Sequence, residues 1–283
     1  MAKSIRKIGE FLPTVLERVR PGNEARRGLQ GVATGLRRLD QLTGGWHKGD
    51  LIVIGGRPSM GKTALACQFA LHAALDPQIP VIYFSLDLSR EGLALRLTAA
   101  LAGVHLQRLR AAQLDAKEWE QVEIASQQLA TSPLYLDDTA QSISDIYVRA
   151  RFAANEYGIG LAIVDFLQAI SPARAADPSA KPVESSTALK SLARELRVPI
   201  IALSKLNRWA ESRQYPLLSD LSGSSAIEDD ADIVMMLYRE DVYRDHTPRE
   251  GTADISIVKH RNGPPRTIWT FFRPETCSFK EIG

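Results

Sequence analysis

The chain has 283 residues, of which 45% are hydrophobic, so it is long enough for one large core or for one core plus an appendage. Its 35 basic and 33 acidic residues nearly balance, so the overall charge indicates neither a nucleic acid nor a membrane as partner. Cys67 and Cys277 lie far apart and without metal-ligand spacing, which excludes a disulfide framework or a cysteine-based zinc site and fits a reducing cytoplasm. No apolar stretch reaches the roughly 18 residues of a membrane helix, and the amino terminus lacks the apolar run of a signal peptide.

The first 30 residues are expected to form an element apart from the rest. Apolar residues recur there at helical spacing and give one stripe, made of Ile5, Ile8, Leu12, Val15, Leu16 and Val19. Pro13 would kink such a helix or begin its second half, and residues 20–28 (RPGNEARRG) have the composition of a linker. The stripe packs either on the chain's own body or on a neighbouring subunit, so we predict a linker and oligomerisation region at 1–30.

From residue 31 onward, short apolar segments alternate with helix-like segments such as 63–74 and 89–101, which indicates an α/β fold with helices on both faces of a sheet. Residues 253–272 (ADISIVKHRNGPPRTIWTFF) predict two antiparallel strands joined by a turn at the sheet edge. The Pro-, Ala- and Ser-rich segment 171–186 predicts a long loop. Runs that are apolar on both faces are typical of buried strands in a mostly parallel sheet, and they occur at 51–55, 81–85, 161–165, 199–204 and 233–238.

The segment 56–63 (GRPSMGKT) matches the pattern of a phosphate-binding loop, with a strand before it and a helix after it. Glycines let the backbone turn so that successive N–H groups point at phosphate oxygens, and the following helix adds its positive end. Lys62 can reach the β- and γ-phosphates, and the Thr63 hydroxyl can hold Mg²⁺. The nucleotide-binding residues predicted in this segment are Gly56, Arg57, Pro58, Ser59, Met60, Gly61, Lys62 and Thr63.

Asp165 ends the apolar run LAIVD, where a buried strand delivers one acid to the edge of the sheet. This is the Walker B arrangement, in which the carboxylate holds Mg²⁺ directly or through water. Together with Thr63 it predicts the metal site of a protein that binds ATP and Mg²⁺.

Several segments, in the same order along the chain, resemble the ATPase domain of DnaB-type replicative helicases. They are 34–66 with the phosphate loop, 164–170 (VDFLQAI), 192–213, 218–241 and 259–267 (KHRNGPPRT). The resemblance covers about residues 31–272 and implies a RecA-like ATPase domain at 31–283. It further implies a homo-oligomeric ring, usually a hexamer, around single-stranded DNA. ATP would lie between subunits, with Arg261 and Lys259 supplied by the next subunit.

The stripe at residues 5–19 is similar to the family's linker helix, which docks on an adjacent subunit. The family's amino-terminal helical domain is expected to have no counterpart in this sequence. The resemblance implies a helicase loader or a primase as partner. The expected lack of the amino-terminal domain weakens the prediction of primase binding in particular.

The sequence departs from the family pattern at three chemically sensitive positions. Asp87, in FSLD, stands where the family has its catalytic glutamate, so the carboxylate lies one methylene farther back and hydrolysis is expected to be slow. Lys205 replaces a glutamine that senses the γ-phosphate, and we expect it to pair with Asp87 at rest and with the γ-phosphate when ATP is bound. Ser222 replaces an arginine that contacts DNA phosphate.

Two loops are candidates for contact with DNA. The backbone amides of the first loop can grip phosphate, although the lost cation should lower affinity and its dependence on salt. That loop consists of Ser222, Gly223, Ser224 and Ser225. The segment 171–186 offers Arg174 and Lys181, for which a merely solvated position is the alternative.

Two other functions stay open on the sequence alone. The three departures favour a scaffold or helicase-associated regulator that binds ATP with little or no hydrolysis. Against this, Lys62, Thr63, Asp165 and Arg261 are all intact. A RadA- or KaiC-like ATPase is the other alternative, although neither a four-cysteine zinc module nor a second tandem ATPase copy is present in the sequence.

Overall fold

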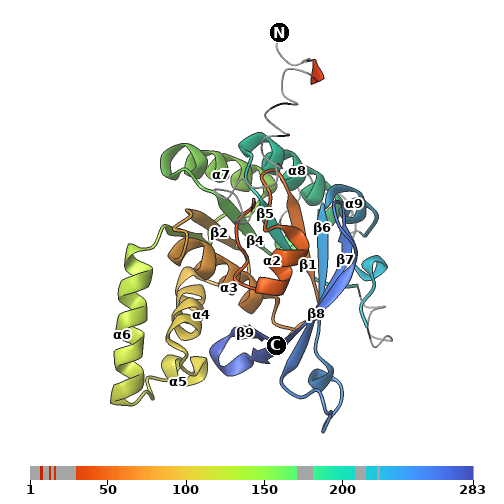
Figure 1. Cartoon of the computed structure of the whole chain (residues 1–283). Helices are drawn as coiled ribbons and strands as arrows, with labels where there is room; N and C mark the ends of the chain where they lie inside the picture. The colour runs from red at the N-terminus through yellow and green to blue at the C-terminus, as the bar shows by residue number, and fades with distance from the viewer. Residues whose placement is uncertain are drawn as a thin grey trace.

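The computed structural model describes residues 30–170, 181–207, 215–221 and 224–282, together with residues 7, 8, 13 and 16. Within these residues the centre of the molecule is a nine-stranded sheet with the order β3-β2-β4-β5-β1-β6-β7-β8-β9 (Figure 1). The strands from β3 to β6 in this order pair in parallel, and the last three join in antiparallel fashion. The predicted α/β fold, with antiparallel strands at the carboxyl-terminal end, is confirmed.

The five apolar runs predicted as buried strands are strands in the structure. They are β1 (Leu51–Gly55), β2 (Val81–Ser85), β4 (Leu161–Asp165), β5 (Ile200–Ser204) and β6 (Ile233–Tyr238), and every residue in them is buried. The predicted terminal hairpin consists of β7 (Thr252–His260) and β8 (Arg266–Arg273), to which β9 (Ser278–Glu281) is added. The edge strand β3 (Leu134–Asp137) was not predicted, because its four half-buried residues carry no long apolar run.

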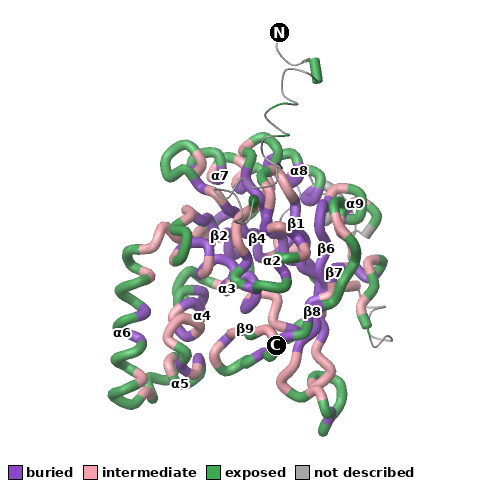
Figure 2. The backbone as a smooth tube through the Cα atoms, in the orientation of Figure 1, coloured by how far each residue is buried: buried purple, intermediate pink, exposed green. Residues whose placement is uncertain are grey.

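Successive residues of the parallel strands point into two separate cores, one on each face of the sheet, which is why these strands are apolar throughout. The first core is covered by α2 (Arg37–Thr43), α3 (Lys62–Leu75), α4 (Arg90–Ala102), α5 (Leu106–Arg110) and α6 (Ala116–Thr131). The second is covered by α7 (Ile143–Tyr157), α8 (Lys181–Leu196) and α9 (Ser224–Asp230). Figure 2 shows the buried sheet between the more exposed helices.

Over the ranges that the structure describes, four 3-10 turns lie in the connections between the strands and helices. They are η2 (Leu167–Ala169), η4 (Leu218–Asp220), η5 (Glu240–Val242) and η6 (Pro274–Thr276). None of the helices in the described part of the chain is both long and apolar enough to cross a membrane.

The predicted loop at 171–186 is wrong in its last six residues, because α8 already begins at Lys181. Proline is favoured in the first turn of a helix, so Pro182 starts this helix rather than preventing it. Ser185 and Ser186 are buried, and the Ser186 hydroxyl donates to Asp230 Oδ2 at 2.8 Å. Residues 171–180 of that loop, including Arg174, lie outside the described residues. The same holds for most of the predicted stripe at 5–19, of which Ile8 and Leu16 are described and exposed.

Candidate nucleotide site

The phosphate loop lies between the carboxyl end of β1 and the start of α3. Gly61 caps the helix with φ 94°, a left-handed conformation that favours glycine. A Cβ at Gly61 would also lie 2.9 Å from a ring carbon of Phe279, so the position excludes a side chain on packing grounds as well. The Lys62 ammonium donates to the carbonyl oxygens of Gly56 at 2.6 Å and Arg57 at 2.9 Å, which closes the loop around it.

The two predicted magnesium ligands are in direct contact. Asp165 stands at the carboxyl end of β4, and Thr63 in the first turn of α3 donates its hydroxyl hydrogen to Asp165 Oδ2 at 2.9 Å. Asp165 is 4% exposed. Burial raises the pKa of this carboxyl, while the hydrogen bonds from Thr63 and Tyr83 oppose the rise. A buried carboxylate beside a hydroxyl forms a pair of hard oxygen ligands at the loop.

Burial also shifts the pKa of Lys62, the lysine of the phosphate loop. It lowers the pKa of Lys62 to about 8, with the nearby Asp165 carboxylate opposing this shift and the Lys205 cation adding to it. A desolvated ammonium interacts more strongly with an incoming anion than a hydrated one does. The lysine is therefore well placed to attract phosphate.

Residues from distant parts of the sequence line one cavity of about 800 Å³ at this edge of the sheet. Those predicted from the sequence are Pro58, Ser59, Gly61, Lys62, Thr63, Asp87, Asp165 and Lys205. Of the other loop residues, Met60 is 1% exposed and packs in the first core, and the Arg57 guanidinium lies 5.6 Å from the centre of the Tyr243 ring. The structure thus brings together the loop, the metal ligands and two of the three positions that depart from the family pattern, Asp87 and Lys205.

Asp87 reaches this cavity because β2 and β4 are neighbours in the sheet. Ser85 pairs with Asp165 in the parallel register, and the backbone N–H of Leu86 donates to the Asp165 carbonyl at 2.8 Å. The two carboxylates therefore lie at the ends of adjacent strands. Asp165 is buried whereas Asp87 is exposed, so Asp87 is the one that solvent can reach.

We expect Asp87→Glu to raise the rate of ATP turnover, because the longer side chain brings the carboxylate about one methylene closer to an attacking water. A positional error near 1 Å can cost on the order of a hundredfold in rate, which sets the upper bound of the gain. Asp87→Asn keeps the shape but removes the base, and it should lower turnover. Steady-state turnover of the three proteins measures both effects. Equal rates for Asp87→Glu and Asp87→Asn would contradict a role for this carboxylate as base.

The predicted resting pair of Lys205 with Asp87 is wrong. The Lys205 ammonium lies 3.6 Å from the centre of the Phe166 ring, and among the described residues no ion pair joins it to Asp87. Phe166 directly follows Asp165 and offers the lysine the negative face of an aromatic ring at close range. Lys205 nonetheless lines the cavity, so its predicted contact with the γ-phosphate remains a prediction.

Arg239 is a residue of this site that sequence reasoning missed. It follows β6 and donates to the carbonyl oxygen of Ser59 in the phosphate loop at 3.0 Å. The same guanidinium pairs with Asp241 at 3.0 Å and lies 4.7 Å from the centre of the Phe272 ring. Arg239 therefore fixes the position of the phosphate loop at Ser59. The available signal was its position after a buried strand, since parallel strands all end at the same edge of the sheet.

Arg96 and Arg110 also line the cavity, from α4 and α5. No motif marks these two arginines, because helices far from the phosphate loop in sequence bring them there. With Lys62, Lys205 and Arg239 they make the cavity rich in cations, which suits a polyphosphate.

Lys259 and Arg261 lie at the opposite edge of the sheet. Lys259 pairs with Val234, which is level with Val53 in the middle of β1, and the backbone N–H of Arg261 donates to the Asp232 carbonyl just before β6. The Lys259 ammonium contacts the carbonyl of Glu228, and an Arg261 amine donates to the carbonyl of Asp229 at 3.2 Å. The phosphate loop follows the carboxyl end of β1, about 13 Å along the strand from Leu51, whose carbonyl accepts the N–H of Asp232 beside Arg261. Neither cation lines the cavity of its own chain.

The structure leaves most of the predicted DNA-contacting residues undetermined. Ser222 and Gly223 lie outside the described residues, and for Ser224 and Lys181 the backbone alone is described, as the first residues of α9 and α8. Ser225 is exposed in α9.

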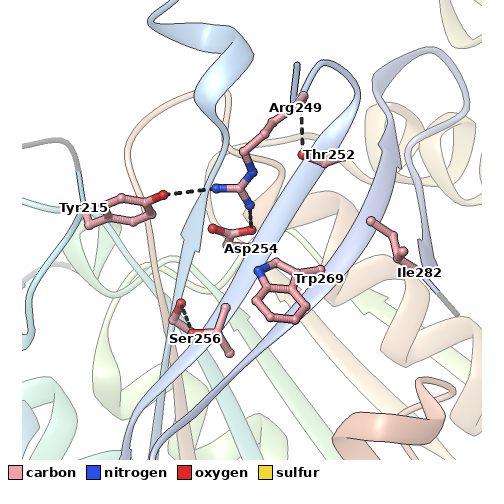
Figure 3. A pocket seen from close by; sticks show the side chains of 8 residues that line it. Tyr215, Arg249, Thr252, Asp254, Ser256, Trp269 and Ile282 are labelled. Carbon is pink, nitrogen blue, oxygen red and sulfur yellow. Dashed lines mark hydrogen bonds and ion pairs between the residues drawn. The ribbon is translucent and has the colours of Figure 1, made fainter. Parts of the chain in front are cut away.

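A second hollow of about 640 Å³ lies on the outer face of β7 and β8, next to the exposed Trp269 (Figure 3). Arg249 crosses it, donating to Asp254 and to the Tyr215 hydroxyl, the latter at 3.0 Å. Ser256 and Thr267 hydrogen-bond to each other across the hairpin at 3.0 Å. These polar groups hydrogen-bond to one another, so we do not assign this hollow as a second nucleotide site.

A family model for the DnaB-like helicase C terminal domain matches residues 31–281. The chain belongs to this family. Among curated members, the replicative DNA helicase DnaB of Leifsonia xyli subsp. xyli is 38% identical over 97% of this chain and 61% of its own length. The replicative DNA helicase DnaC of Bacillus subtilis is 37% identical over 99% of this chain and 63% of its own length. The chain thus spans less than two thirds of the length of these relatives.

Solved structures similar to this chain have the same fold. One of them, an isolated ATPase domain, superposes with a TM-score of 0.92 at 32% identity, covering 99% of this chain and all of that one. A DnaB-like replicative helicase, described together with its interactions with primase, superposes with a TM-score of 0.89 at 33% identity, covering 99% of this chain and 68% of that one. The RecA-like fold expected from the sequence is therefore confirmed.

Proposed function

We propose that this chain is the ATP-driven motor of a DnaB-type replicative helicase, which binds ATP at the cavity of the phosphate loop and hydrolyses it. The observation that carries the proposal is the convergence of Lys62, Thr63 and Asp165 at one edge of the sheet, with Thr63 and Asp165 hydrogen-bonded to each other. Membership of the helicase family supports the same reading.

The side-chain oxygens of Thr63 and Asp165 fit a Mg²⁺ site. Thr63 Oγ1 and Asp165 Oδ2 are hard oxygens 2.9 Å apart. Among the described residues no cluster of three or more His, Cys, Asp or Glu residues could hold a metal by itself. Mg²⁺ suits such a sparse site, since it usually takes one or two protein oxygens and completes its shell with water and substrate phosphates. When bound, it would neutralise charge on the β- and γ-phosphates.

The residues of the chain have separate tasks in the proposed hydrolysis. Lys62 holds the β- and γ-phosphates, and Asp87 accepts a proton from the attacking water. Lys205 can leave the Phe166 ring to contact the γ-phosphate. Arg261 and Lys259 do not line the cavity of their own chain, and we assign them to the nucleotide of an adjacent copy, where a cation stabilises charge on the transferred phosphoryl group.

Single-stranded DNA is the proposed substrate of the motor, and a homohexameric ring is the proposed assembly. We assign 31–283 to the motor and 1–30 to the contact between subunits. The loop of residues 222–225 and the start of α8 are the proposed DNA contacts. A helicase loader or a primase is the proposed protein partner, and a similar solved structure is described with its interactions with primase. The cytoplasm is the proposed location.

We expect purified chain to hydrolyse ATP and to do so faster with single-stranded DNA. Lys62→Ala should lower turnover about a hundredfold or more, because it removes a preorganised cation from the developing charge. Lys117→Ala, which removes an exposed lysine from α6, is the matched control and should leave turnover unchanged. Tight ATP binding without turnover in either condition would overturn the motor and favour a scaffold that uses ATP for assembly.

A further inference from the structure

Tyr83 is a fully buried tyrosine whose hydroxyl contacts the metal-binding carboxylate. It lies in β2 and pairs with Ile163 of β4, two residues before Asp165, so that its ring and Asp165 lie on the same face of the sheet. The Tyr83 hydroxyl donates to Asp165 Oδ2 at 3.0 Å. The ring is packed in the first core, under α3.

Two donors from different elements converge on this one oxygen. Thr63 approaches Asp165 Oδ2 from α3, and Tyr83 approaches it from β2. The carboxylate itself is carried by β4, so three elements fix its rotation. Cys67 lies one helical turn after Thr63 and is fully buried in the first core together with Tyr83.

A purely structural explanation of Tyr83 is weak. A phenylalanine would fill the same volume without a polar atom to bury, and a buried hydroxyl costs free energy unless it finds a partner. The hydroxyl finds that partner in the buried carboxylate of Asp165, to which it donates at 3.0 Å. Hydrogen bonds to a carboxylate are among the strong ones, so the two donors hold this side chain in one orientation.

We propose that Tyr83 is a positioning residue for the metal site, which holds the Asp165 carboxylate in the orientation that Mg²⁺ requires. The proposal rests on the nucleotide site proposed above. It predicts a specific defect when the hydroxyl alone is removed, since outer-shell partners of metal ligands typically contribute about 10- to 100-fold to metal affinity.

The test is the equilibrium binding of a fluorescent ATP analogue by Tyr83→Phe, measured in EDTA and then as a function of Mg²⁺ concentration. We expect half-saturation by Mg²⁺ to need about tenfold more metal than in the parent chain. Affinity for the analogue in EDTA should stay within about twofold of the parent, because the phosphate loop itself is unchanged. Direct titration with Mn²⁺, followed by its electron paramagnetic resonance signal, should show the same weakening.

Tyr147→Phe is the matched control. It removes the same atom from a tyrosine on α7, whose hydroxyl donates to the Ala188 carbonyl at 3.2 Å on the other face of the sheet. It should leave the Mg²⁺ titration unchanged. A merely structural Tyr83 would lower the melting temperature of its variant but leave half-saturation by Mg²⁺ as in the parent, and that result would overturn the proposal.

The remaining outcomes separate this inference from the proposed function. Equal weakening in EDTA and in Mg²⁺ would show a distorted pocket and would also overturn a positioning role. If the parent binds the analogue, Lys62→Ala does not, and Tyr83→Phe titrates like the parent, the nucleotide site stands and only the role of Tyr83 falls. A parent chain that binds no nucleotide overturns both.

Discussion

Replacing Arg261 with alanine is expected to lower ATP turnover about a thousandfold while ATP affinity changes little, because an arginine that acts on transition-state charge contributes on the order of 10³ to 10⁵ in rate. The side chain lies near the amino end of β1 and β6, whereas the phosphate loop of the same chain follows the carboxyl end of β1. The loss should therefore appear at the neighbour's nucleotide.

Mixing two inactive variants gives the decisive measurement. Arg261→Ala retains a sound phosphate loop, and Lys62→Ala retains a sound arginine, so mixed assemblies contain interfaces in which both are intact. Turnover should reappear on mixing, in proportion to the fraction of such interfaces. Arg266→Ala, an exposed arginine at the start of β8 in the same hairpin, is the control and should behave like the parent. Absence of any recovery in assembled mixtures would exclude action between copies.

The second large effect concerns stability, at Asp232. This carboxylate forms a buried ion pair with Lys190 of α8, and the two side chains are 8% and 9% exposed. Asp232 Oδ2 also accepts the backbone N–H of Leu51 at 2.8 Å, and Lys190 donates to the Gly49 carbonyl at 2.7 Å. Asp232→Ala leaves the ammonium buried without its anion. We expect the free energy of unfolding to fall by about 3–5 kcal/mol, as is usual when one partner of a buried pair is removed.

Urea unfolding measures this change, and a double variant tests its cause. Replacing both partners by apolar residues, in Lys190→Met with Asp232→Leu, removes the buried charge and should recover much of the loss. A single variant as stable as the parent would show that water or another anion satisfies Lys190. Asp232 Oδ1 also lies 3.4 Å from Arg261 Nε, so the same variant should remove one contact that orients the Arg261 side chain.

The parts of this molecule that sequence patterns predicted are those in which local chemistry leaves few choices. A strand between two layers of helices must be apolar on both faces, and such runs revealed β1, β2, β4, β5 and β6. A loop that wraps phosphate needs glycine and a cation at fixed spacing, which revealed 56–63. The edge strand β3 was not predicted, because a half-buried strand at the edge of a sheet needs no continuous apolar run.

The parts that were missed depend on which elements become neighbours. Lys205 and Asp87 line the same cavity, but the ring of Phe166 lies closer to the ammonium, and no pattern in the sequence indicates that contact. Arg239 and Tyr83 act at the site from β6 and β2, one on the phosphate loop and one on Asp165. Their roles follow from the strand order of the sheet, which nonlocal packing decides.

The separation of Arg261 from the phosphate loop, at opposite edges of one sheet, has a consequence for assembly. Two copies joined through these surfaces use one arginine and one loop, while the second arginine and the second loop remain at the two ends of the pair. Such head-to-tail contacts never saturate in an open chain, since each added copy restores the same two ends. Under the proposed function, an open row of n copies has n − 1 complete sites, and closure into a ring completes the last one.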